Sequence, residues 1–116
     1  MSVRFDASGD KLTRTTGLPS SLQSNFTVCG WAKISTDRND WSTFVSLSVS
    51  SSAFVYIQTF SDGVKWQLWT DSGSSDIYTA TVGEWVFLVL RIYQSGTWFV
   101  EAGYSTLSGT SITWAS

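Results

Sequence analysis

Hydrophobic residues in this chain recur at every second position, and this alternation constrains the fold more than any other feature of the sequence. The clearest stretch sets one apolar series against a more polar one: Phe26, Val28, Gly30, Ala32 and Ile34 against Thr27, Cys29, Trp31 and Lys33. Successive side chains of a β-strand point to opposite faces, so this pattern predicts a strand with one apolar face. No segment shows a convincing helical period; residues 18–22 could form one helical turn at most.

The strand pattern continues to the C-terminus. We expect strands at 43–49, 53–60, 64–70, 77–82, 84–93, 97–104 and 111–115, with two short ones at 3–5 and 11–13. Asp62-Gly63 predicts a hairpin turn, because such turns need positive φ angles, and Asp71–Ser75 predicts another. Residues 84–93 are apolar on both faces, which is typical of a strand in the middle of a covered sheet. Short strands separated by regular turns predict an antiparallel sandwich or barrel.

Composition limits both the architecture and the partners. A chain of 116 residues predicts one domain, 1–116, and a hydrophobic content of 42% is enough for a core. The net charge is -2 and the basic residues are scattered, which argues against nucleic acid or a membrane surface as a partner. The longest apolar run, Trp85–Leu90, is far shorter than the ~20 residues that cross a bilayer, so we expect no membrane insertion.

The single cysteine and the N-terminus carry little functional information. Cys29 lies within a strand pattern, where a free cysteine is usually a small buried hydrophobe, and we expect it to be buried. Residues 1–4 lack the apolar segment of a signal peptide, so the sequence leaves the compartment open.

Four segments, in this order and spacing, resemble strands of laminin-G-like domains in the concanavalin A-like lectin/glucanase superfamily. They are Val3–Asp6, Asn25–Ser35 (NFTVCGWAKIS), Val82–Arg91 and Gly96–Gly103. The resemblance implies an antiparallel two-sheet jelly-roll sandwich, and an extracellular or virion-associated setting. The family continues with further strands, so the resemblance also implies a shortened domain, a fragment, or a sheet completed by a neighbouring chain. Unpaired sheet edges invite pairing, which makes a homo-oligomer through open edges an expectation.

Most catalytic chemistry is excluded by composition. The chain has no histidine and one cysteine, which excludes a His/Cys metal site and a Ser-His-Asp triad. Glycoside hydrolases of the resembling fold carry clustered carboxylates in a groove, whereas the only glutamates here, Glu84 and Glu101, are far apart in sequence. We therefore expect no enzyme, and keep a degenerate glycoside hydrolase as the third interpretation.

Calcium is the one metal that the sequence leaves open. Asp37, Asn39 and Asp40 form the densest group of oxygen donors, which are the ligands calcium prefers. Asp and Asn are also ordinary turn formers, and Arg38 lies among them. No cofactor is required, and Asp37 and Asp40 are the expected ligands if calcium binds.

Tryptophan is the strongest oddity of the composition, with seven in the chain. We expect Trp31, Trp66 and Trp85 to be packing residues of the core. Sugars bind by placing their C–H faces on exposed aromatic rings, while polar side chains read the hydroxyls. The predicted binding site therefore joins exposed aromatics to the acidic loop: Trp41, Asp37, Asn39, Asp40, Trp69 and Tyr78.

The sequence thus favours a non-catalytic carbohydrate- or cell-surface-binding module whose partner is a glycan or glycoprotein surface. The alternative is a structural assembly subunit, such as a virion or surface decoration protein, that uses the same fold for self-association. In that case the aromatic residues cover the sandwich or form an interface.

Overall fold

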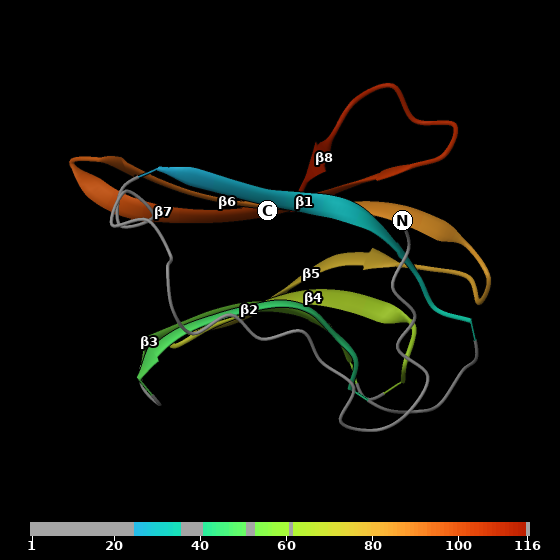
Figure 1. Ribbon diagram of the computed structural model, residues 1–116, viewed down its shortest axis with the longest axis horizontal. Helices are drawn as coiled ribbons and strands as arrows, with labels where there is room; N and C mark the ends of the chain where they lie inside the picture. Colours follow the sequence, from blue (N-terminus) through green and yellow to red (C-terminus); the bar gives the residue numbers. More distant parts are fainter. Residues whose placement is uncertain (1–24, 36–40, 51–52, 61, 116) are drawn as a thin grey trace, which may run out of the picture.

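The computed structural model of the chain describes residues 25–35, 41–50, 53–60 and 62–115. These residues form eight strands: β1 (Phe26–Lys33), β2 (Thr43–Ser50), β3 (Ala53–Thr59), β4 (Lys65–Thr70), β5 (Gly73–Thr79), β6 (Trp85–Ser95), β7 (Thr97–Thr106) and β8 (Thr113–Trp114). Two antiparallel four-stranded sheets, in the orders β1-β6-β7-β8 and β2-β3-β4-β5, lie face to face (Figure 1). The predicted all-β, two-sheet sandwich is therefore confirmed. The described residues contain no helix that is long and apolar enough to cross a membrane.

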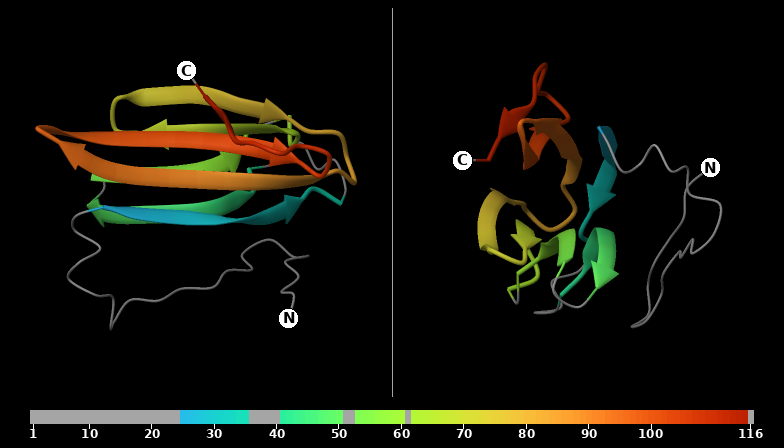
Figure 2. Two further views of the ribbon diagram at one scale, coloured as in Figure 1. Left: turned by 90° about the horizontal axis from the view of Figure 1, so that it is seen from above. Right: turned by 90° about the vertical axis from the view of Figure 1, so that its left-hand side faces the viewer.

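The two sheets differ in how the chain builds them. Strands β2 to β5 follow one another in sequence and pair in that order. The other sheet pairs β1 with β6, with Phe26 opposite Ile92 and Lys33 opposite Trp85, and then adds β7 and β8. The chain therefore leaves this sheet after β1 and returns to it at β6, as the two views of Figure 2 show.

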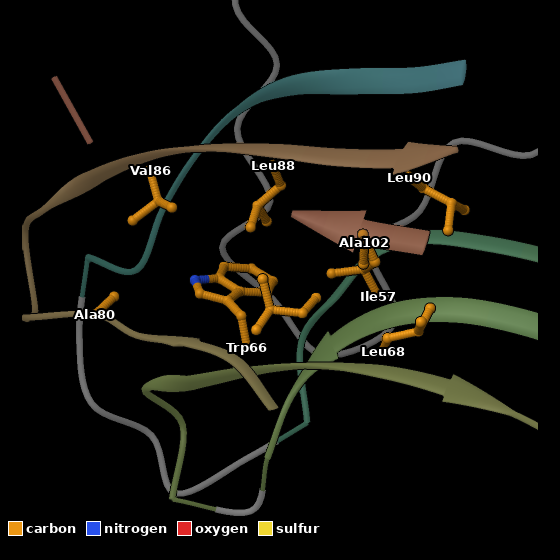
Figure 3. Close-up of a cluster of buried hydrophobic side chains, with 9 residues drawn as sticks. Ile57, Trp66, Leu68, Ala80, Val86, Leu88, Leu90 and Ala102 are labelled. Carbon is orange, nitrogen blue, oxygen red and sulfur yellow. The ribbon is translucent and has the colours of Figure 1, made fainter. Parts of the chain in front are cut away.

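The core lies between the sheets. Ile57, Val86, Leu88 and Leu90 are fully buried there, with Ala102 beside them (Figure 3). Three of these residues are alternate positions of β6, which lies between β1 and β7 as its apolar sequence predicts. Burying a side chain of this size stabilises the fold by roughly 1.5–3 kcal/mol, so β6 holds much of the stability.

Trp66 of β4 completes the core, as expected. Its side chain is only 4% exposed and lies among the buried aliphatic residues in Figure 3. The indole N–H has no hydrogen-bond partner among the described residues. A buried donor without a hydrogen bond destabilises the folded state. Trp66 therefore stabilises the fold through its buried apolar surface and destabilises it through its indole N–H.

Strand β1 alternates between partly buried and exposed side chains along its whole length, as its sequence predicts. Phe26, Val28, Gly30 and Ala32 face the other sheet, whereas Cys29 is exposed. The expectation that Cys29 is buried is therefore wrong. Its odd position in the alternation places it on the outer face of β1, which is the outermost strand of this sheet among the described residues.

The ends of two strands differ from expectation. β5 begins at Gly73, because Thr70 pairs with Gly73 across the turn residues Asp71 and Ser72, and it ends at Thr79. The expected five-residue turn and the expected strand at 77–82 are thus displaced. β8 is shorter than expected, and the strands expected at 3–5 and 11–13 and the turn at 18–22 lie outside the described residues.

The Asp-Gly turn before β4 is confirmed. Gly63 has a φ of 75°, a conformation that glycine adopts without strain. The backbone N–H groups of Val64 and Lys65 each donate to the Asp62 carboxylate at 3.0 Å. These two bonds hold the pKa of Asp62 below its usual range.

Candidate functional site

Five aromatic rings lie in a continuous row on the outer face of the β2–β5 sheet. The centroid of the Trp41 ring is 5.5 Å from that of Phe60 and 5.6 Å from that of Trp69, both with edge-to-face geometry. Trp69 stacks with Tyr56 at 6.2 Å, and Tyr56 stacks with Phe54 at 5.1 Å. We call these five residues (Phe54, Tyr56, Trp69, Trp41 and Phe60) the aromatic row.

Strand register explains why the rings share this face. In β3, Ile57 points into the core, so its neighbour Tyr56 points outward. Tyr56 pairs directly with Trp69 of β4, which brings their rings together across the strands. The sheet is bowed, and its outer face lies on the inside of the bow (Figure 1). The aromatic row therefore lies on the concave side of this sheet.

The rings remain accessible to a ligand. Trp41 is 45% exposed, and Phe60 is exposed at the end of the row. Phe54, Tyr56 and Trp69 are half-buried, since each packs against its neighbours along the row. Half-exposed stacked rings present a flat face to solvent while their edges stay fixed, so the row is ordered before any ligand arrives.

A chain of polar side chains runs beside the aromatic row. The Trp69 indole N–H donates to Gln67 Oε1 at 3.2 Å, the Gln67 amide donates to Asp76, and Lys65 Nζ lies 3.4 Å from Asp76 Oδ2. We call Trp69, Gln67, Asp76 and Lys65 the polar chain. The hydrogen bond from Gln67, with the nearby Lys65 charge, holds the pKa of Asp76 below its usual range. Lys65 also lies 5.6 Å from the centroid of the Phe60 ring, which links the polar chain to the end of the row.

Gln67 is the anchor of this arrangement. Its side chain is only 7% exposed although the residue lies on an outer face, and its amide both accepts from Trp69 and donates to Asp76. Those two bonds fix which end of the amide carries the oxygen and hold the Trp69 ring in place. Asp76 remains exposed, with carboxylate lone pairs left for a ligand hydroxyl.

The structure brings together two of the residues predicted for the site and separates a third. Trp41 and Trp69, which the prediction assigns to one site, are in ring contact. Tyr78 is elsewhere: it stacks on Tyr104 of the opposite sheet at 4.3 Å, and its hydroxyl donates to Glu84 at 2.8 Å. Tyr78 therefore does not join Trp69 on the outer face of the β2–β5 sheet, although the prediction assigns both to one site. That hydrogen bond raises the pKa of Tyr78 and ties it to the turn before β6.

The acidic part of the predicted site cannot be placed. Asp37, Asn39 and Asp40 lie outside the described residues, so the calcium hypothesis for Asp37 and Asp40 stays a prediction. Within the described parts of the chain, no group of three or more metal-ligating side chains comes together.

Sequence reasoning missed Phe54, Tyr56 and Phe60 as members of the site. The signal was present, because Phe54 and Tyr56 of β3, and Phe60 just after it, alternate in sequence with Val55, Ile57 and Thr59. All three aromatic residues occupy even-numbered positions, so the period of two predicts that they lie on one face. The role of Gln67 had no sequence signal, since its partners come from two strands.

A second aromatic surface lies on the outer face of the β1-β6-β7-β8 sheet. Trp31 is 46% exposed and Trp85 is 41% exposed, so the expectation that both are core residues is wrong. Trp31 lies at an odd position of β1 and directly opposite Phe87 of β6, with ring centroids 5.3 Å apart. Lys33 lies 5.0 Å from the centroid of the Trp85 ring.

The same outer face carries an ion-pair cluster around Arg91. Its guanidinium lies 4.9 Å from the centroid of the Tyr93 ring and 4.7 Å from that of Trp114, and it donates to the Glu101 carboxylate. Tyr93 donates a hydrogen bond to the other oxygen of Glu101 at 3.0 Å. Arg91 holds the pKa of Glu101 below its usual range, with Tyr93 adding to the effect. The cluster fastens Trp114, and with it β8, to the sheet.

Comparison with known proteins gives the chain no relative. No family model matches it, and no curated protein and no solved structure matches it either. The resemblance to laminin-G-like domains therefore stays a prediction, and the function rests on the geometry of this chain alone.

Proposed function

We propose that this protein is a non-catalytic carbohydrate-binding module whose site is the aromatic row with its polar chain. The observation that carries the proposal is the continuity of five rings along one accessible face. Each ring offers an apolar surface for the C–H face of a sugar, and Gln67 and Asp76 offer polar atoms for its hydroxyls. On this proposal the sandwich is of the concanavalin A-like jelly-roll type, as the resemblance implies.

The shape and charge of the site suggest the class of glycan. Successive ring centroids lie 5.1 to 6.2 Å apart along the row, so the row is much longer than one sugar ring and suits a linear oligosaccharide. Asp76 is paired with Lys65, so the two charges of the polar chain offset each other. An uncharged glycan is therefore favoured over a sulfated or sialylated one.

A glycan array with the protein multimerised on beads tests this proposal, because avidity reveals weak single sites. We expect selective binding to uncharged linear glycans. Trp69→Ala should weaken binding by about 2 kcal/mol, roughly thirtyfold, as for a tryptophan at the centre of an interface. Trp31→Ala, on the outer face of the other sheet, is the matched control and should leave binding unchanged.

The array also separates the remaining alternatives. Loss of binding in EDTA would support the hypothesis that Asp37 and Asp40 bind calcium, and unchanged binding would argue against it. A blank array, or full binding by Trp69→Ala, would contradict the proposal. The mutant's circular dichroism must match that of the parent protein, since Trp69 also packs within the row.

A degenerate glycoside hydrolase has less support. Retaining and inverting enzymes need two carboxyl groups facing one sugar across roughly 5–10 Å. Glu84 accepts hydrogen bonds from Tyr78 and from the backbone of Thr81, and Glu101 is engaged with Arg91 on the outer face of the other sheet. Both glutamates therefore have structural partners, and neither lies in the aromatic row.

The assembly-subunit alternative is favoured by a different observation. The second aromatic surface, around Trp31 and Trp85, is apolar and exposed, and it lies away from the aromatic row. Binding and self-association can therefore coexist on opposite faces of one sandwich.

A further inference from the structure

The outer face of the β1-β6-β7-β8 sheet carries a knob and two hollows. Leu107, at the start of the β7–β8 connection, is 70% exposed. A hollow of about 310 Å³ lies between Leu107, Trp31, Phe87 and residues 109–112, and a second of about 280 Å³ lies between Leu107, Trp31 and Trp85. We call this surface the Trp31 face. The β7–β8 connection stands away from the sheet (Figure 1).

Local packing fixes the position of Leu107. The backbone N–H of Gly109 donates to the carbonyl of Thr106 at 3.0 Å and closes a tight turn around Leu107. A Cβ at Gly109 would overlap Ser105 Oγ, so the connection rests directly on β7. The exposed leucine therefore lies on an ordered turn. Little conformational entropy of this turn is lost when a partner covers it.

We propose that a second copy of this chain covers the Trp31 face, with Leu107 of each copy in a hollow beside Trp31 of the other. A twofold contact brings the same patch of both subunits together, so the patch must complement itself. An exposed leucine next to a hollow lined by Trp31 and Trp85 meets this requirement. None of the residues that line the two hollows is charged, and Lys33 lies over the Trp85 ring at their edge.

The exposed area sets the strength of the dimer. An aromatic side chain has roughly 150–250 Å² of surface, so Trp31 and Trp85 each expose about 100 Å². With Leu107 and Trp114 the apolar patch reaches about 400 Å² per subunit, or about 800 Å² in a dimer, against the ~1,200 Å² of small stable interfaces. The apolar area is thus below that of a stable interface, and we expect a weak association that depends on protein concentration.

This arrangement leaves the aromatic row free in both copies. The row lies on the outer face of the opposite sheet, so a dimer through the Trp31 face presents two rows pointing away from each other. Two weak glycan sites on one particle gain avidity when the target surface is multivalent. The dimer itself does not depend on the glycan proposal, and its test contains no glycan.

Sedimentation velocity of the full chain from 10 µM to 1 mM tests the inference. The weight-average mass should rise from that of the 12.8 kDa monomer towards twice that value. Leu107→Asp should weaken association at least tenfold, because it places a charge in the apolar hollow. Val82→Asp is the matched control: Val82 is an aliphatic residue of the β5–β6 turn that is 42% exposed, and its replacement should leave association unchanged.

Cys29 supplies an independent readout, since it is exposed on the same outer face as Trp31. Its reaction rate with a thiol reagent should fall as protein concentration rises, and Leu107→Asp should abolish that dependence. A monomer at 1 mM would overturn the inference. Association that Leu107→Asp leaves intact would overturn it equally, because the copies would then meet through another surface, such as a sheet edge.

Discussion

Gly103→Ala tests how β8 is held against the sheet. A Cβ at Gly103 would lie 2.7 Å from Ile112 Cγ2, 2.8 Å from the carbonyl oxygen of Thr113 and 3.0 Å from Trp114 Cε3. One of these neighbours is backbone, and Trp114 is also held by Arg91, so the methyl group cannot be accommodated by a rotation of one side chain. We expect β8 to be pushed away from β7.

The size of the effect follows from two opposing terms. Overpacking of this kind costs about 1–3 kcal/mol. Replacing glycine by alanine also restricts the unfolded chain, which stabilises the protein by about 0.4–1 kcal/mol. The expected net loss in the free energy of unfolding is therefore about 1–2 kcal/mol, or a fall of several degrees in Tm.

Gly30→Ala is the matched control, a glycine in β1 of the same sheet. A Cβ there would meet the Phe44 ring at 3.4 and 3.6 Å, which is ordinary van der Waals contact. Only the unfolded-state term then applies, so we expect a change between zero and about 1 kcal/mol of added stability.

Urea denaturation of the three proteins, with hydrogen exchange at the Ala115 amide, measures both aspects. That amide donates to the carbonyl of Ala102 at 2.9 Å and should lose protection in Gly103→Ala alone. Equal stability of the two alanine variants, with Ala115 still protected, would refute the reasoning and show that β8 does not rest on Gly103.

Two further predictions concern charge and the core. The pKa of Glu101 is lower in the folded protein than in the unfolded chain, so its stabilising effect is full above the unfolded value of about 4.3 and is lost as pH falls through the folded value. Glu101→Gln should therefore flatten the fall in unfolding free energy below about pH 5, measured by urea denaturation at several pH values; an unchanged slope would contradict the assignment. Trp66→Phe removes a buried N–H that has no partner among the described residues, and should cost less than about 2 kcal/mol, against about 3–5 kcal/mol for Trp66→Ala. Thermal denaturation checks this, and equal losses in the two variants would show that the indole N–H is not a liability.

Periodicity was sufficient to predict most of the strands and the sandwich. β1 shows the expected inward and outward alternation, and the apolar sequence of β6 correctly placed it between two other strands. The same alternation places Trp31 on the outer face together with Cys29. The expectation of a buried Trp31 was wrong because it followed from the size of the side chain and not from its position in the alternation.

Only part of the site could be predicted from the sequence, and a β-bulge is the reason that Tyr78 was misplaced. The pairing of β4 with β5 shifts between Trp66 and Gln67, so that Trp66 lies opposite Tyr78 while Gln67 lies opposite Asp76. A shift of one residue moves a side chain to the other face of a sheet. The bulge turns Tyr78 towards Tyr104 and leaves Asp76 beside the aromatic row. Nothing in the local sequence indicates that the strands shift register at this point.

The pairing of β1 with β6 also determines the order in which this molecule can assemble. The whole of the β2–β5 sheet lies between these two strands in the chain, so their pairing closes a long loop. The conformational entropy of that loop is lost before the contacts between the two strands can form. The β2–β5 hairpins close short loops and can form first, offering an apolar face on which β6 then condenses. Contacts this distant in sequence make folding slow, in the range of milliseconds to seconds for sandwiches of similar topology. Until β1 docks, β6 has a bare edge, and it is in this interval that the chain is most exposed to aggregation.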